Sequence, residues 1–279
     1  MIKITCDLHA HTHLSSCADS TATIPYYVKK AKELGLNTVG ITDHLWDTAI
    51  PFSDAMRHSK TAGPGGDGPI RWYAVQNLPH VLQIREELAS MVTGGVRFLV
   101  GAEVEYCQGY GPAIAEDNVG LLDFLIVPIS HTHMMMPSDY YFPYERHARF
   151  MIDAFFELCA CPLARYVTAV AHPFDAVAAP YDNRFVMEKI SDAQYAECFC
   201  AAREAGIAME INAASLRGDT GAEMQKDEAF RMLSIAKSCG VRFTFGSDAH
   251  SEGGHDTFFR AGIMADLLAL SSTDILEVS

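Results

Sequence analysis

The sequence lacks an excess of positive charge and lacks any apolar run long enough to cross a membrane. Its 279 residues include 21 lysines and arginines against 35 aspartates and glutamates, which gives a formal net charge of −14. A spanning helix needs roughly 20 apolar residues, and a passive nucleic-acid surface needs a basic stripe. We therefore expect no membrane segment and no long nucleic-acid partner. A small phosphorylated metabolite stays compatible, because bound cations would dominate the local field.

The sequence also lacks a linker-like segment, an internal repeat and a recognisable secretion signal. Its eight cysteines are irregularly spaced, and the C-x-C pairs at 159–161 and 198–200 lie in helical patterns, where positions i and i+2 face different directions. With 49% hydrophobic residues, the chain can bury a full core without disulfide bonds. We expect a single cytoplasmic domain over residues 1–279, with most cysteines buried and reduced. The oligomeric state stays open.

What the sequence does contain is a regular alternation of strand and helix patterns. Seven apolar runs predict strands, namely IKITCDLHAH, NTVGITDH, VRFLVGAEV, LLDFLIVPIS, YVTAVAH, IAMEINA and VRFTFGSD. The first predicted helix begins near Thr23 and stops at Gly35, a single helix is predicted over 78–91, and a later one has Ser191 as its N-cap. Seven β/α units predict an α/β fold, a distorted TIM-like (β/α)7 barrel. An open sheet fits less well, since it would gather its ligands at one switch point.

Six of the apolar runs end in side chains that can bind metal ions. The residues at these ends are His9 and His11, His44, Glu103, His131, His172, and Asp248 with His250. A buried parallel strand needs an apolar body, but it does not need an imidazole at its tip. In α/β barrels, catalytic residues gather at the C-terminal ends of the strands. The pattern therefore predicts a metal cluster at one end of a barrel, and with it a hydrolase.

The motifs at these strand ends resemble those of the PHP (polymerase and histidinol phosphatase) family. They are DLHAHT at 7–12, GITDH at 40–44, GAEVE at 101–105, PISH at 128–131, VAHP at 170–173, EIN at 210–212 and GSDAH at 246–250. They stand in the family's order, and no polymerase module accompanies them. The chain is thus most similar to the stand-alone histidinol-phosphatase-type members, and the resemblance implies a PHP-type barrel.

The resemblance implies a site for two or three divalent transition metals. The implied ligand sets are His9, His11, Glu103 and Asp248 for one metal, Glu103, His131 and His172 for a second, and His44, His250 and one further residue for a third. Glu103 would bridge the first two metals, because a shared carboxylate offsets the repulsion between dications. Histidine and carboxylate ligands suit zinc, manganese or iron(II).

Cys17 marks the main departure from the family pattern. It stands six residues after His11, where the motif tends to carry a histidine. Its thiolate could complete the third ligand set, which would favour zinc there. Alternatively, Asp19 reaches into the set, or the third site is weak or empty.

Three residues are predicted to contact the substrate. Arg217 follows the sixth strand and could hold a phosphate through two hydrogen bonds. His133 repeats the H-x-H spacing after His131, and His255 lies beyond the last motif, where it could instead cap the final helix. For Arg217, as for Lys60 and Arg71, an ordinary surface charge is the alternative.

Two further features lie near the predicted site. Residues 46–77 have no clean period and contain GPGGDGP, and a loop of this length is usually functional or mobile. Because it follows His44, we expect it to form a lid or a substrate-facing wall, with a simple surface excursion as the alternative. Glu105 shares the strand face of Glu103 and is interpreted as a support for the ligands or as an alternative bridge. His147 is expected at the surface.

These observations predict a metal-dependent phosphoesterase. The favoured reaction is hydrolysis of a small phosphomonoester similar to histidinol phosphate, by attack of a metal-bound hydroxide. Asp248, His250 and Glu103 are the expected catalytic residues. Asp248 would orient the nucleophile, and a protonated histidine or a metal-bound water would protonate the leaving group. The alternatives are a nucleotide phosphodiesterase or exonuclease-type hydrolase, and a non-catalytic metal-binding regulatory barrel.

Overall fold

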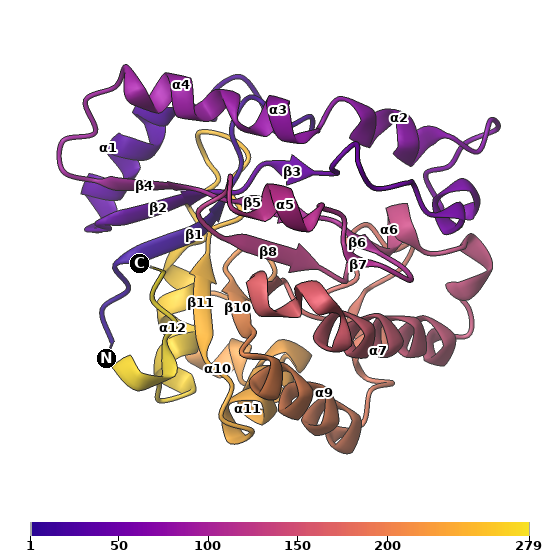
Figure 1. Cartoon of the computed structure of the whole chain (residues 1–279). Helices are drawn as coiled ribbons and strands as arrows, with labels where there is room; N and C mark the ends of the chain where they lie inside the picture. Colours follow the sequence, from indigo (N-terminus) through magenta and orange to yellow (C-terminus); the bar gives the residue numbers. More distant parts are fainter. Residues whose placement is uncertain (1, 279) are drawn as a thin grey trace.

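The computed structural model describes residues 2–278 and shows parallel strands surrounded by helices (Figure 1). The main strands are β1 (Cys6–Ala10), β2 (Thr38–Ile41), β3 (His44–Leu45), β4 (Arg97–Val100), β5 (Ala102–Val104), β8 (Leu125–Pro128), β9 (Val167–Ala171), β10 (Ala208–Asn212) and β11 (Phe243–Gly246). A short antiparallel pair, β6 (Tyr106–Cys107) and β7 (Gly111–Pro112), stands apart from them. All seven strands expected from the sequence are present.

The strands close into a barrel. They form two parallel sheets, in the orders β1-β2-β4 and β11-β10-β9-β8-β5-β3. The sheets are continuous, because β2 leads into β3 and β4 leads into β5 after one or two residues. The last strand meets the first through a parallel bridge between Ala10 and Ala249, and the backbone N–H of Asp248 donates to the carbonyl of His9. The predicted distorted (β/α)7 barrel is therefore confirmed.

The helices cover the outside of this barrel (Figure 1). They are α1 (Ile24–Leu34), α2 (Gly68–Ala74), α3 (Leu78–Val81), α4 (Gln83–Ala89), α5 (Glu116–Val119), α6 (Thr132–Met135), α7 (Tyr144–Ala160), α8 (Arg184–Met187), α9 (Asp192–Ala205), α10 (Gly221–Met224), α11 (Glu228–Ser238) and α12 (Phe259–Leu267). Thr23 caps α1, Gly35 ends it with a φ of 70°, and Ser191 forms a capping box on α9. The single helix predicted over 78–91 is wrong. It is two short helices, and Leu82 between them has a ψ of −14°, outside the regular helical value.

The end of the barrel away from the metal-capable residues is filled by Phe124. A Cβ added to Gly40 or to Gly101 would lie 2.6 Å from its ring, so both strands need glycine where they pass the ring. Leu8 and Ile126 pack into the same apolar cluster. This filled floor makes the barrel a packed core, and it leaves only the opposite end open for chemistry.

Residues 46–77 contain regular structure and pack against the rest of the protein. They contain a 3-10 helix (Asp54–His58) and α2. Trp46 is fully buried and donates from Nε1 to the Ile50 carbonyl at 2.9 Å. Thr61 donates from both its backbone nitrogen and its hydroxyl to the His133 carbonyl. A Cβ on Gly68 would lie 2.0 Å from the Thr61 carbonyl oxygen, so α2 starts in tight contact with the preceding loop.

Two expectations about burial, for the cysteines and for His147, differ from the structure. The eight cysteines are free thiols, but only Cys107 and Cys198 are buried, so the expectation that most are buried is wrong. His147 is buried inside the α7 packing rather than placed at the surface. Among residues 2–278, no helix combines the length and apolar character that a membrane crossing requires.

Candidate metal centre

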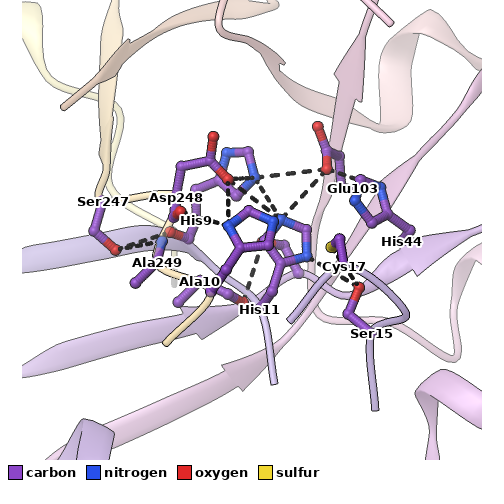
Figure 2. A network of polar contacts seen from close by, with 12 residues as sticks. His9, Ala10, His11, Ser15, Cys17, His44, Glu103, Ser247, Asp248 and Ala249 are labelled. Atoms are coloured by element: carbon purple, nitrogen blue, oxygen red, sulfur yellow. Dashed lines mark hydrogen bonds and ion pairs between the residues drawn. The ribbon is translucent and has the colours of Figure 1, made fainter. Parts of the chain in front are cut away.

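Side chains from the strand ends converge on Glu103, whose carboxylate is 1% exposed (Figure 2). Its two oxygens face different groups of histidines. Oε2 lies 3.0 Å from Nδ1 of His44 and 3.5 Å from Nε2 of His11. Oε1 lies 2.9 Å from Nε2 of His172 and 3.5 Å from Nε2 of His131. One carboxylate therefore connects two groups of potential metal ligands, as a bridging residue must.

The first group brings two histidine nitrogens and two carboxylate oxygens close together. Its atoms are Nε2 of His9, Nε2 of His11, Oε2 of Glu103 and Oδ1 of Asp248. The two histidine nitrogens lie 3.1 Å from each other and 3.3–3.7 Å from the two carboxylate oxygens. Four ligands placed 2.0–2.1 Å from a tetrahedral zinc ion lie about 3.4 Å apart. These five spacings are compatible with His9, His11 and the two carboxylates as ligands of one such ion.

Two further groups of ligand atoms lie beside the first. Glu103, His131 and His172 offer atoms within 4.8 Å of one another and are all buried. His11, Cys17, His44 and His250 do the same, and the rings of His11 and His250 stack at 4.2 Å. All nine residues predicted as metal ligands thus fall in adjoining clusters. Asp19 lies outside them, because its carboxylate is exposed and accepts hydrogen bonds from the Thr21 backbone and hydroxyl.

Each of four histidines has one ring nitrogen held by a polar partner. Nδ1 of His9 contacts Glu210 at 2.7 Å, and Nδ1 of His131 contacts Glu105 at 2.6 Å. Nδ1 of His172 lies 2.6 Å from the Ser130 hydroxyl, and Nδ1 of His250 lies 2.7 Å from the carbonyl of Asp248. The carboxylate and carbonyl partners accept from Nδ1 and so fix the tautomer, which leaves the Nε2 lone pair for a metal; the Ser130 hydroxyl does the same for His172 when it accepts from Nδ1.

Glu210 and Asp7 are supporting residues that the sequence analysis missed. Glu210 also accepts from the backbone N–H of His172 at 2.7 Å. Asp7 is fully buried. Its carboxylate accepts hydrogen bonds from the backbone N–H of Ser247 at 2.9 Å and from the hydroxyl of Ser247 at 2.6 Å. Asp7 stands two residues before His9 on β1, so the two-residue period that relates His9 to His11 could have pointed to it. Glu210 carried a comparable signal, as an acid inside a buried strand.

The backbone is strained at two of the predicted ligands. Asp248 has a φ of 56° and His172 a φ of 28°, both in the left-handed region that residues other than glycine rarely adopt. Non-glycine residues persist in sparsely populated conformations only when their surroundings determine them, and such residues cluster at functional sites. The strain therefore agrees with a functional role for these two positions.

The electrostatics of the cluster favour ionised carboxylates. Burial alone would raise the pKa of Glu103, but His44, His131 and His9 hold it well below its usual range. The pKa of Asp248 is likewise well below its usual range, because His9 and His11 outweigh burial. Burial lowers the pKa of His11 to about 4, and the neighbouring His250 adds to the effect. Charged carboxylates and a neutral imidazole are the forms that bind metal ions.

A cavity of about 490 Å³ opens onto the cluster. Its lining includes His133 as well as the metal-capable residues, so His133 is placed where a substrate contact requires it. Residues 61, 68, 72 and 73 also line it, so the irregular segment forms a wall of the cavity, as expected. This volume is typical of small-molecule sites.

The other two predicted substrate contacts are absent from the described lining of this cavity. Arg217 is exposed, and its two terminal nitrogens bind Asp182 at 2.9 and 2.8 Å, so its guanidinium already holds a carboxylate. His255 is 4% exposed, and its Nε2 lies 2.8 Å from Asp7, behind the metal cluster.

Comparisons with known proteins give a family match and a similar fold. The family model described as PHP domain matches residues 7–214. The fold is similar to a protein assigned as the histidinol phosphatase hisK from Listeria monocytogenes, with 14% identity, a TM-score of 0.64, and coverage of 91% of this chain and 98% of that one. It is also similar to histidinol phosphate phosphatase from Lactococcus lactis, solved with zinc, L-histidinol and phosphate, with 19% identity, a TM-score of 0.57, and coverage of 92% and 94%. No curated protein matches the chain in sequence.

Proposed function

Because the chain belongs to the PHP domain family and is a metal-dependent phosphoesterase of that family, we propose that it hydrolyses small phosphomonoesters at the end of the barrel. The observation that carries this proposal is the bridging position of Glu103 beneath a cavity of about 490 Å³. The Lactococcus lactis protein was solved with L-histidinol and phosphate, the two products of such a reaction. Histidinol phosphate is therefore the reference substrate for assays.

The proposal assigns two or three divalent metals to the clusters. His9, His11, Glu103 and Asp248 would hold the first, Glu103, His131 and His172 the second, and His44, His250 and Cys17 the third. Nitrogen and oxygen donors suit zinc, manganese or iron(II), and the thiol of Cys17 favours zinc in the third set. Such ions, when bound, neutralise phosphate oxygens and make water a nucleophile at neutral pH.

The protein's own groups position the reaction. The buried carboxylate of Glu103 and the partly exposed carboxylate of Asp248 stay ionised and line the cavity. Asp248 also contacts the amide of Asn212 through Oδ2 at 3.3 Å, which fixes its orientation for aligning the attacking water. His250 is the one member of its cluster besides Cys17 that is not fully buried. With Nδ1 on the Asp248 carbonyl, its Nε2 can bind metal when neutral or donate a proton to the leaving oxygen when protonated.

The test is phosphate release from a panel of phosphomonoesters and phosphodiesters after loading with Mn²⁺ or Zn²⁺. Hydrolysis of the monoesters, with two or three metal ions per chain by elemental analysis, is the expected result. Preferential cleavage of diesters would favour the nucleotide phosphodiesterase alternative. Metal binding without turnover of any ester would favour a regulatory barrel. The Glu103→Ala protein serves as the control for contaminating phosphatase.

A further inference from the structure

The part of the cavity wall that does not belong to the metal clusters is largely apolar. Trp72 and Tyr73 come from α2, Met134 comes from α6, and Val177 follows β9. We propose that the substrate's organic group is apolar and uncharged, and that the site discriminates against an ammonium such as that of histidinol phosphate. This inference rests on the proposed function, since it concerns the group attached to the phosphate.

The cavity lining, over residues 2–278, has no acidic side chain outside the metal clusters. Among the lining residues that the structure describes, the only acidic side chains are Glu103 and Asp248. Both are surrounded by histidines and belong to the metal clusters, so neither is free to pair with a substrate ammonium. Outside the lining, the exposed Lys60 ammonium donates to the carbonyl of Ala178, the residue after Val177, at 2.6 Å. No carboxylate of the described lining is therefore left free for a substrate ammonium.

The wall is built before a substrate arrives. The indole of Trp72 packs edge-to-face on Tyr73 at 4.6 Å and on His44 at 5.0 Å. The Thr61 hydroxyl contacts Sδ of Met134 at 3.0 Å and the carbonyl of His133 at 2.8 Å. These contacts join the irregular segment to α6, so the apolar surface is held in place rather than closed onto the ligand. Preorganised apolar walls favour ligands that bury carbon.

An ammonium loses its hydration on entering this wall and finds no free carboxylate there; the buried atoms of the described lining without a partner are Nδ1 of His133 and the hydroxyl of Tyr73, and neither is a carboxylate. Burying an unpaired charge is unfavourable, whereas burying a methyl group of the same size is favourable. One indole offers a cation only a weak attraction, and ammonium-binding sites use several aromatic faces together. We therefore expect the uncharged ligand to bind at least tenfold more tightly. The lost hydration weakens binding of the ammonium, and the burial of carbon strengthens binding of the methyl group.

The experiment compares two isosteric, non-hydrolysable ligands, pentylphosphonate and 4-aminobutylphosphonate, which differ by a methyl group in place of an ammonium. Their Kd values are measured by calorimetry on the metal-loaded protein, with quenching of tryptophan fluorescence as a second readout. Pentylphosphonate binding at least tenfold more tightly is the expected result. Equal binding, or tighter binding of the amine, would overturn the inference.

Two variants test the wall itself. Val177→Asp should supply the missing carboxylate and bring the two Kd values together or reverse their order, while the isosteric Val177→Asn should keep the tenfold preference. Trp72→Ala should weaken pentylphosphonate binding more than aminobutylphosphonate binding. If Val177→Asp leaves the preference unchanged, the wall does not contact this part of the ligand and the inference fails. Because these readouts need no turnover, they stay separate from the phosphate-release assay, whose failure would count against the proposed function alone.

Discussion

Oε1 of Glu210 lies 2.7 Å from Nδ1 of His9, and both side chains are buried inside the barrel. The contact places the proton of His9 on Nδ1 and leaves Nε2 to face the cluster. The other oxygen of Glu210 accepts from the backbone of His172, where φ is 28°. One carboxylate thus orients two predicted ligands that stand 163 positions apart in the sequence.

Glu210→Gln should weaken metal retention about 10- to 100-fold, the usual effect of losing a partner that orients a ligand. The amide can present a donor to Nδ1 of His9, which would put the histidine in the wrong tautomer. The measurement is metal content after dialysis against a graded series of chelator concentrations. Glu204→Gln, at an exposed site, is the matched control. Equal metal retention in the two variants would refute the role of Glu210.

Glu103→Ala should lose more activity than alanine at any single histidine of the clusters. The substitution removes ligand atoms from two metal groups and leaves the repulsion between neighbouring dications unscreened. Phosphate release and metal stoichiometry, measured on the same preparations, check this expectation. A Glu103→Ala protein that keeps its metals and near-normal turnover would transfer the bridging role to another group, with Glu105 the first candidate.

Cys17 should bind metal as a thiolate beside His44 and His250. Although Cys17 is exposed as a residue, the protein atoms around its sulfur desolvate it and raise the pKa of the metal-free thiol to about 12, so a cation must displace its proton. Loading with Co²⁺ should produce a sulfur-to-metal charge-transfer band, and Cys17→Ser should lose both the band and one metal equivalent. Cys17→His should keep the metal and accept Mn²⁺ more readily. A band that survives in Cys17→Ser would show that the sulfur comes from another residue.

Gly246→Ala and Gly262→Ala should have opposite effects. A Cβ on Gly246 would lie 1.9 Å from Oε1 of Glu210 and 2.6 Å from Cβ of His9, so we expect a loss of about 1–3 kcal/mol and weaker metal binding. Gly262 lies within α12 with open space where its Cβ would go, so alanine there should stabilise by about 0.5–1 kcal/mol. Urea unfolding of both variants checks the signs. A neutral Gly246→Ala would show that the strand end can move.

His147 should make the protein less stable below neutral pH. Burial lowers its pKa to about 4, whereas an unfolded histidine has a pKa of about 6.5. Its Nδ1 contacts the Tyr181 hydroxyl at 2.6 Å, and its buried Nε2 has no partner among the described residues. The unfolded state therefore binds more protons between these values. This contribution to stability is complete above about pH 6.5 and falls by up to about 3 kcal/mol as the pH drops to about 4.

The measurement for His147 is the urea midpoint from pH 4.5 to 7.5 in the wild type and in His147→Gln. The wild-type curve should fall more steeply on acidification, and the difference between the two curves isolates this residue from the histidines of the metal clusters. Parallel curves would show that the imidazole is protonated without penalty in the folded state.

Features set by neighbouring residues in the chain could be predicted from the sequence. Features set by contacts between residues far apart in the chain could not. Strand ends could be read directly, because apolar runs and the residues that follow them are neighbours in the chain. The positions of Arg217 and His255 could not be read, since they depend on Asp182 and Asp7, which lie 35 and 248 positions away. His147 was misplaced for the same reason: the aromatic side chains that enclose it include Tyr181, 34 positions away.

The closure of the barrel has a consequence for the timing of folding. Asp7 and Ser247, which join the first and last strands, are 240 positions apart, and the first metal group includes His9 on one strand and Asp248 just after the other. During synthesis, His9 emerges long before Asp248, so that group is complete only after nearly the whole barrel has been made. Contacts of such long range form slowly. The rate at which the first metal binds during refolding therefore reports how fast the barrel closes. It can be compared with the rate at which helices form, measured by circular dichroism.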